Sequence, residues 1–336
     1  MYYERVSPNA PTLTQVIEGL KTWQAQHNPF DRTSQLNLFQ FVVEEGKGGA
    51  LVPFGNNLEE GSHMPTIYLQ PNALGQYLTR LQYPQPIYQR LPARLNCLNI
   101  NWLIQNGNYT RDALFRILDD NQARALMTDM YQPIDNLDLL TMIEPYLGGG
   151  KVRWHFDDQL TFHISISFPE YAEEIKVGDI VERGLHISNS EVGLRSITIA
   201  GYLYRLVCKN GAIGSGGGDS YRFRHIGDPD RLREKVQAAV ESTKIETARI
   251  TAQFKNALTV QIAQPFEFME KIVKERALTQ EEFKAIMNSY MEAPEDKGNL
   301  YGVSQAISNA ANLLEGERSY ELQRIAVDVS GLPRVD

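Results

Sequence analysis

The sequence predicts an α+β fold: a twisted antiparallel β-sheet of hairpins backed by a long helix, with a helical N-terminal region and a helical C-terminal tail. Two segments between residues 152 and 166 alternate apolar and polar side chains, the period of a half-buried strand. From residue 228 towards residue 262, apolar side chains recur every three or four positions, the period of an amphipathic helix. Helical spacing also prevails in most of the chain before residue 150 and after residue 263.

We divide the 336 residues into three regions that form one integrated domain. Residues 1–150 are a mixed helical and strand region, residues 151–262 a β-rich core with the long helix, and residues 263–336 a helical region. In the first region we expect helices at 12–26, 71–83, 92–103, 111–118 and 137–146, strands at 36–43, 51–54 and 123–128, and a polar loop at 55–66. Pro84 and Pro86 end one of these helices and Pro92 begins the next.

The register of the first hairpin in the core follows from its apolar pattern. A loop at Asp157-Asp158-Gln159 pairs Trp154 with Phe162 and Val152 with Ile164, which keeps one face apolar. A two-residue loop would place apolar side chains opposite polar ones, so we predict the three-residue loop.

Further strands are expected at 180–188 and 194–200, and residues 202–208 either continue a strand or form a short helix. Residues 214–218 read as a flexible loop, because four of the five are glycine. The third region is expected to hold helices at 265–275, 279–292 and 300–327, the last broken at Gly316.

The composition restricts the classes of function. A net charge of −8 argues against a globally basic coat, yet the middle of the chain, residues 151–258, is the one part without net negative charge. Cys97 and Cys208 are too few for a disulfide framework and fit free thiols in a reducing compartment. The first residues lack the apolar core of a signal peptide, and no run is long enough to span a membrane. We therefore expect a cytoplasmic protein that does not contact membranes.

The sequence shows no motif of nucleophilic or zinc-dependent catalysis. The glycine-rich run at 214–219 lacks the Gly-Lys-Ser/Thr ending of a phosphate-binding loop. His155 and His163 fall on the polar face of the predicted hairpin, but Arg153 opposite His163 disfavours a metal ion there. We expect no catalytic residue, no metal and no cofactor.

Cations and tyrosines gather around the glycine-punctuated segment 184–211. Cationic side chains hold phosphates, and aromatic rings stack on unpaired bases. The candidate nucleic-acid-binding residues are Lys151, Arg153, Arg183, Arg195, Arg205, Lys209, Arg222 and Arg224, with Tyr202, Tyr204 and Tyr221 as stacking candidates. Arg205 has a second interpretation, a buried structural cation, because on a strand it shares a face with Ile197 and Leu203.

Several segments resemble the phage/plasmid-like domain-of-unknown-function family numbered 932. They include Ala123-Arg124-Ala125-Leu126, Tyr131-Gln132-Pro133-Ile134-Asp135-Asn136, Ser188-Asn189-Ser190-Glu191-Val192-Gly193 and the run 205–211. Leu91 to Leu95, Asn99 to Leu103 and Ala306 to Ala326 also fit, so the likeness spans residues 70–330. It implies a gene carried by phages, plasmids or related mobile elements. The hairpins followed by a long helix are also similar, in architecture alone, to ring-forming single-strand annealing recombinases.

Together these observations favour binding of single-stranded DNA or RNA, including annealing, in recombination or replication of a mobile element. An annealing protein holds many nucleotides at once, so we expect a homo-oligomer. Two other functions stay open: a protein-interaction module that modulates host functions, and an enzyme whose site is assembled in space.

Overall fold

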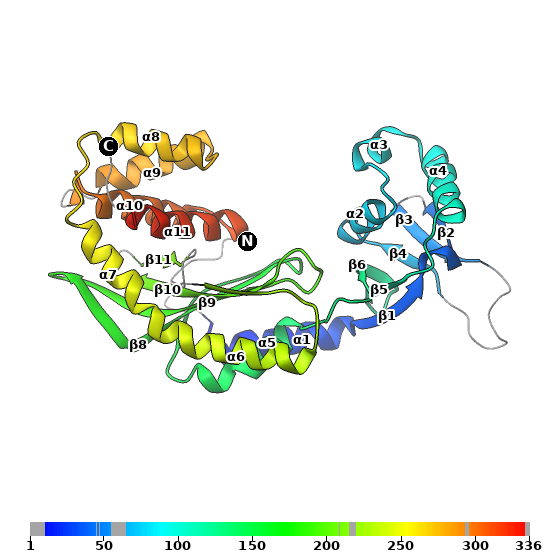
Figure 1. Cartoon of the computed structure of the whole chain (residues 1–336), viewed down its shortest axis with the longest axis horizontal. Coiled ribbons are helices and arrows are strands. Elements are labelled where there is room, and N and C mark those ends of the chain that lie inside the picture. Colours follow the sequence, from blue (N-terminus) through cyan, green and yellow to red (C-terminus); the bar gives the residue numbers. More distant parts are fainter. Residues whose placement is uncertain are drawn as a thin grey trace.

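The computed structural model describes residues 11–44, 46, 48–54, 65–207, 209–214, 220–292 and 296–332. These residues form an elongated molecule with two lobes, each built around its own β-sheet (Figure 1). Most of the loop expected at 55–66, most of that expected at 214–218, and Cys208 lie outside the described residues.

The N-terminal lobe is a six-stranded sheet in the order β1-β5-β6-β4-β3-β2, antiparallel except where β4 pairs with β6. Its strands are β1 (Phe30–Gln35), β2 (Phe39–Glu44), β3 (Gly48–Pro53), β4 (Ile67–Leu69), β5 (Asp112–Ile117) and β6 (Gln122–Thr128), and its helices are α2 (Pro71–Arg80), α3 (Gln85–Arg90) and α4 (Ala93–Asn106). Phe39, Phe41, Tyr77 and Phe115 fill the core between the sheet and these helices.

The C-terminal lobe contains the predicted twisted antiparallel sheet, in the order β11-β10-β9-β8-β7, with β12 also paired to β10. Its strands are β7 (Lys151–Asp157), β8 (Phe162–Lys176), β9 (Asp179–Asn189), β10 (Ile197–Arg205), β11 (Asn210–Ile213) and β12 (Ser220–Phe223). Residues 202–205 thus continue a strand, which decides between the two alternatives left open for that segment.

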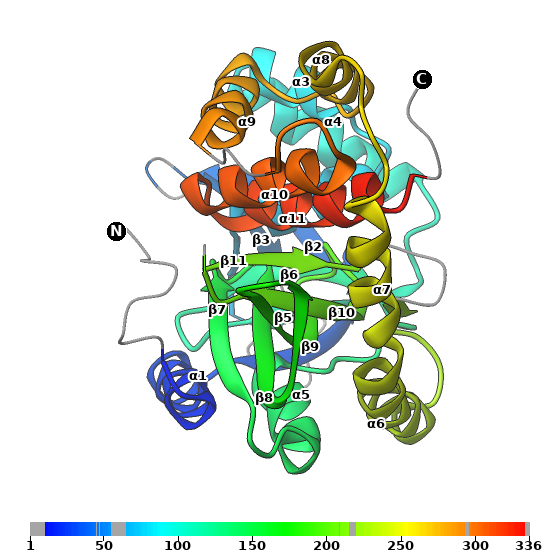
Figure 2. The same cartoon turned by 90° about the vertical axis from the view of Figure 1, so that its left-hand side faces the viewer.

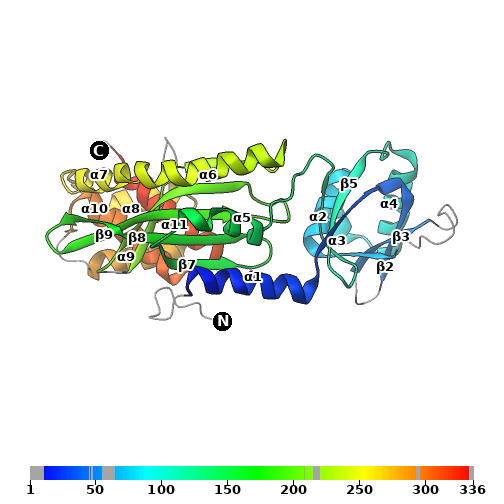
Figure 3. The same cartoon turned by 90° about the horizontal axis from the view of Figure 1, so that it is seen from below.

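Helices cover both faces of this sheet (Figures 2 and 3). One face packs against α1 (Leu13–His27), α5 (Asn136–Ile143) and α6 (Pro229–Glu246) through Ile164, Ile166, Leu185 and Ile187. The other face packs against α11 (Gly316–Ser330), where Tyr320 belongs to one buried cluster with Trp154 and Tyr202. The remaining helices are α7 (Ala248–Ala257), α8 (Pro265–Glu275), α9 (Gln280–Glu292) and α10 (Leu300–Ala310).

The strongest helix signals of the sequence are confirmed. Thr12 caps α1, accepting a hydrogen bond from the backbone N–H of Gln15 while the Gln15 side chain accepts from Thr12 N–H. The helices expected at 265–275 and 279–292, and a helix beginning at Gly316, are present. The long helix is divided into α6 and α7 at Thr247, whose hydroxyl donates to the carbonyl of Thr243 at 2.6 Å, a contact that bends helices.

Two sequence predictions of secondary structure near the N-terminal sheet need correction. The helix expected at 111–118 is wrong: β5 lies between β1 and β6, and its residues from Ala113 to Ile117 are buried. A continuous apolar run has no period that separates such a strand from a helix. The strand expected at 36–43 begins only at Phe39, because Leu36–Leu38 form a 3-10 turn.

The predicted register of the β7–β8 hairpin is also wrong. Trp154 pairs with Ser165 and Phe156 with His163, and a bulge interrupts the pairing between Val152 and Trp154. Trp154 therefore lies on the same face as His163, with ring centroids 5.5 Å apart. His155 pairs with Ile164 and points to the opposite face, so the two histidines do not share a polar face.

Candidate functional site

An open groove lined by four cationic side chains lies where β12 leads into α6. Its volume is about 360 Å³, and it is lined by Arg222, Phe223, Arg224, Ile226, Gly227, Asp228, Arg231, Leu232 and Lys235. Among the described residues none of the four cations has an ion-pair partner, and Asp228 is the one carboxylate in the lining.

The local sequence explains this arrangement. Tyr221 and Phe223 pack against the core beneath α6, and strand alternation leaves Arg222 and Arg224 exposed. Asp228 then caps α6, accepting a hydrogen bond from the N–H of Asp230 at 3.0 Å.

Two of the groove cations, Arg222 and Arg224, were candidates from sequence, whereas Arg231 and Lys235 were missed. Arg231 and Lys235 stand four residues apart on α6, which places them on one helix face. The helix-capping residue Asp228 and the four-residue spacing of Arg231 and Lys235 are the sequence features that indicate these two cations.

Three other candidate arginines are engaged in ion pairs within the fold. Arg153 donates to Glu182 at 2.5 Å and to Ser167 at 2.8 Å, and its guanidinium lies 4.4 Å from the centre of the Tyr204 ring. Arg205 contacts both oxygens of Asp179, at 2.6 and 2.7 Å, and both side chains are buried or nearly so. This burial agrees with the structural interpretation of Arg205.

The third of these arginines, Arg195, pairs with Glu317 at the start of α11 and lies 4.8 Å from the centre of the Tyr320 ring. Glu317 also accepts from His163 Nε2 at 2.9 Å, and His163 Nδ1 lies 3.1 Å from His186 Nε2. Burial lowers the pKa of His163 more than Glu317 raises it, so this imidazole is neutral at pH 7. The cluster fastens α11 to the sheet.

The last three candidate cations do not join the groove. Lys151 is exposed opposite Ser167, Lys209 is exposed in the turn between β10 and β11, and Arg183 lies over the ring of Tyr171. Lys209 is at the far end of β10 from Arg222, a separation of about 25 Å for eight residues of strand.

The three tyrosines differ in exposure. Tyr202 and Tyr204 are buried, with 2% and 3% of their surface exposed, between the sheet and α11. Tyr221 is partly buried against the core beneath α6. Phe223, in the groove lining, is the aromatic ring beside the four cations.

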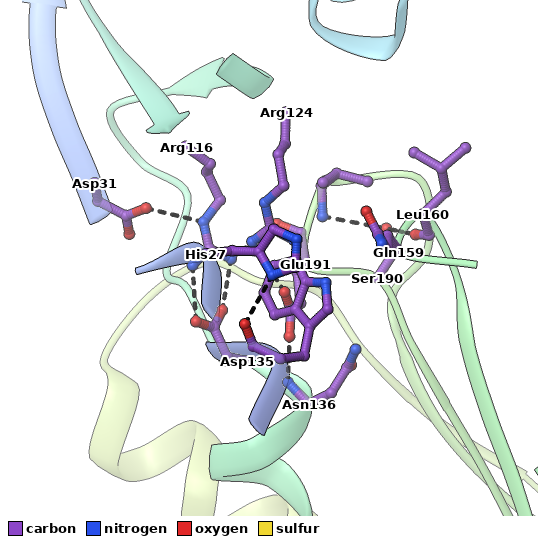
Figure 4. A network of polar contacts seen from close by, with 12 residues as sticks. His27, Asp31, Arg116, Arg124, Asp135, Asn136, Gln159, Leu160, Ser190 and Glu191 are labelled. Carbon is purple, nitrogen blue, oxygen red and sulfur yellow. Dashed lines mark hydrogen bonds and ion pairs between the residues drawn. The ribbon is translucent and has the colours of Figure 1, made fainter. Parts of the chain in front are cut away.

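A second polar cluster joins the two lobes (Figure 4). Arg116 of β5 donates to Asp31 and to Asp135, both at 2.9 Å. Arg124 of β6 donates to Glu191 at 3.0 Å, and the other Glu191 oxygen accepts from the backbone N–H of Asn136 at 2.8 Å. Both arginines are at least 96% buried, because only 4% and 3% of their surfaces are exposed.

The structure offers no metal site of the usual kind within the part it describes: no group of three or more His, Cys, Asp or Glu side chains could hold an ion there. No helix among the described residues combines the length and apolar character needed to cross a membrane.

The fold and the groove define a two-lobed α+β protein with a local cationic surface on an acidic chain. The chain belongs to the family described as Domain of unknown function (DUF932), whose model matches residues 125–325. The match begins in β6 and covers the whole sheet of the C-terminal lobe, including the groove. No curated protein and no solved structure matches the chain.

Proposed function

We propose that this protein binds single-stranded nucleic acid, with the groove between β12 and α6 as its backbone-binding surface. The observation that carries the proposal is the convergence of Arg222, Arg224, Arg231 and Lys235 on one open groove. Cationic side chains without internal partners are free to release counterions from phosphates, which is the main source of affinity for nucleic acid.

The charge of the whole chain limits where binding can occur. A net charge of −8 repels a polyanion at long range, so attraction has to come from a local surface. Phe223 in the groove lining offers an aromatic ring beside the cations, in the manner of stacking surfaces for unpaired bases.

The finer features of this function are part of the same proposal. We propose that the protein acts in the cytoplasm as a homo-oligomer, and that it anneals strands during recombination or replication of a mobile element. In an oligomer, the grooves of several subunits together would bind a longer stretch of single strand than one groove can.

Fluorescence anisotropy with a labelled single strand of about 30 nucleotides tests the groove directly. We expect Arg222→Ala with Arg224→Ala to weaken binding at least about tenfold, because two phosphate contacts are lost. The matched control is Arg90→Ala with Arg94→Ala, which removes the same charge from exposed positions on α3 and α4. Equal weakening by both pairs would reject the groove.

A second candidate function, contact with another protein, is favoured by one surface feature. Leu95, Leu98 and Trp102 follow one another at helical spacing on α4, with 44%, 58% and 62% of their surfaces exposed. Sedimentation of the wild type and of Trp102→Glu tests this surface: a change of oligomeric state would assign it to self-association.

A further inference from the structure

A half-buried cavity lies between α1 and the C-terminal sheet, next to the polar cluster that joins the lobes. It has a volume of about 360 Å³, and its lining includes Trp23, Arg124, Asn136, His155, Asp157 and Glu191. Apolar side chains of α1 form one wall, and polar groups of β7 and the lobe junction form the other. This size is within the range of small-molecule sites.

Three side chains of this lining each carry a buried nitrogen atom with no hydrogen-bond partner among the described residues: Trp23 Nε1, Arg124 Nε and His155 Nε2. Arg124 is 3% exposed, and its guanidinium lies 4.9 Å from the centre of the Trp23 ring. A buried donor without an acceptor is costly, so the Trp23 and Arg124 N–H groups call for an oxygen or nitrogen acceptor.

The two carboxylates of the cavity, Glu191 and Asp157, differ in whether a positively charged side chain pairs with them. Glu191 is held by Arg124 and by the N–H of Asn136. Asp157 accepts from the N–H of Gln159 at 2.8 Å but has no cationic partner among the described residues. At neutral pH Asp157 therefore offers an acceptor to a donor group.

Burial also sets the protonation of the two polar groups on β7. It raises the pKa of Asp157 to about 6 and lowers the pKa of His155 to about 4. His155 is therefore a neutral imidazole at pH 7, able to donate or accept at Nε2 according to its tautomer.

The ligand that fits must carry donors and acceptors together. An alkylamine supplies only hydrogen-bond donors, so it leaves the N–H groups of Trp23 and Arg124 without an acceptor. An inorganic anion supplies only acceptors, and the carboxylate of Asp157 repels it. A nucleobase carries amino or imino donors next to carbonyl or ring-nitrogen acceptors on a flat, weakly charged body. We infer that this cavity is a binding site for a nucleobase, presented as a free nucleoside.

The position of the cavity gives such binding a structural consequence. Arg124, Asn136 and Glu191 belong to three separate segments that also join the two lobes. A nucleoside held there would contact α1, β7 and the junction at once, and would stabilise the docking of the lobes. The inference does not depend on the groove between β12 and α6, which shares no residue with this lining.

Isothermal titration of the full chain with adenosine, guanosine, cytidine and uridine tests the inference. We expect saturable binding of at least one nucleoside with one site per chain. Asp157→Asn, which keeps the shape of the side chain, and Trp23→Phe, which keeps an aromatic ring but removes the indole N–H, should each weaken that binding about tenfold, because each removes one hydrogen bond. The controls are Asp129→Asn and Trp102→Phe, the same changes at exposed positions, which should leave the affinity unaltered.

Binding of benzylamine without binding of any nucleoside would overturn the inference in favour of an amine site. Absence of binding, or affinities unaltered in both cavity variants, would overturn it outright. Arg222→Ala with Arg224→Ala should bind nucleoside as the wild type does, so failure of the groove as a nucleic-acid surface would be seen separately.

Discussion

Arginine side chains in this protein have two different roles, and the contact made by the guanidinium distinguishes them. Arg116, Arg124, Arg153 and Arg205 each meet a carboxylate within the fold, whereas Arg222 and Arg224 meet none among the described residues. Breaking a buried pair leaves a charge without compensation, while losing an exposed cation costs little.

Arg205→Ala should therefore destabilise the protein by about 3–5 kcal/mol, because Asp179 is left buried and charged. Tyr301 donates to the same carboxylate at 2.6 Å but brings no positive charge. Urea unfolding measures this loss, with Arg183→Ala as a control expected to cost less than about 1 kcal/mol. Similar stabilities for the two variants would contradict the structural role of Arg205.

Asp157 should make stability depend on pH. Its pKa rises from 3.8 to about 6 through burial, so the folded state favours the neutral carboxyl; this contribution is complete below pH 3.8 and is lost as the pH rises through 6. Asp157→Asn should thus stabilise the protein by about 1–3 kcal/mol near pH 7.5 and by much less near pH 4. His155 titrates in both proteins and largely cancels in the comparison. A gain of equal size at both pH values would refute the raised pKa.

At the scale of single elements, the hairpin β7–β8 shows what sequence patterns can and cannot determine. Both strands were predicted from alternation, but their register was not, since the turn spans residues 158–161 instead of 157–159. This turn pairs Phe156 with His163, and Trp154, two residues before Phe156, lies on the same face. His163 counts as a polar residue in the alternation pattern, yet its ring is buried on that face among aromatic rings. Similarly, β5 reads as helix because its apolar residues are buried on both faces.

Trp154 is 8% exposed and contacts His163, His186 and the cluster around Tyr320. Trp154→Ala should cost about 3–5 kcal/mol of stability through the cavity it leaves. Thermal and urea unfolding give this value, and Trp102→Ala on the exposed face of α4 serves as the reference. A cost below about 1 kcal/mol would instead describe a surface tryptophan.

At the scale of the whole molecule, the two lobes are joined by the polar cluster around Arg116 and Arg124 and by an apolar cluster in which Leu114, Ala125 and Met127 pack with Val192. The fold class and most of the helices could be predicted because periodicity and capping are local properties of the sequence. The meeting of Arg124, Asp135 and Glu191 could not, because it brings together residues far apart in the chain. For the same reason the sequence predicted only two of the four groove cations. Arg222 and Arg224 were candidates, but Arg231 and Lys235 on α6 were not.

Glu191→Gln should loosen the junction, because Arg124 is left buried without a carboxylate. We expect faster hydrogen exchange in residues 188–195 and at the start of α5, with the core of the N-terminal sheet unaffected. Glu173→Gln, which removes a half-exposed partner of Lys255, is the matched control. Unaltered exchange at the junction would show that Glu191 does not hold the lobes together.

The most direct test of the central claim is the salt dependence of single-strand binding by the wild type and by Arg222→Ala with Arg224→Ala. The logarithm of the wild-type association constant should fall linearly with the logarithm of salt concentration. The double variant should show a slope smaller by about 1–2, one for each phosphate contact removed. A wild-type protein that binds no single strand even at low salt, or a double variant with an unaltered slope, would contradict the account.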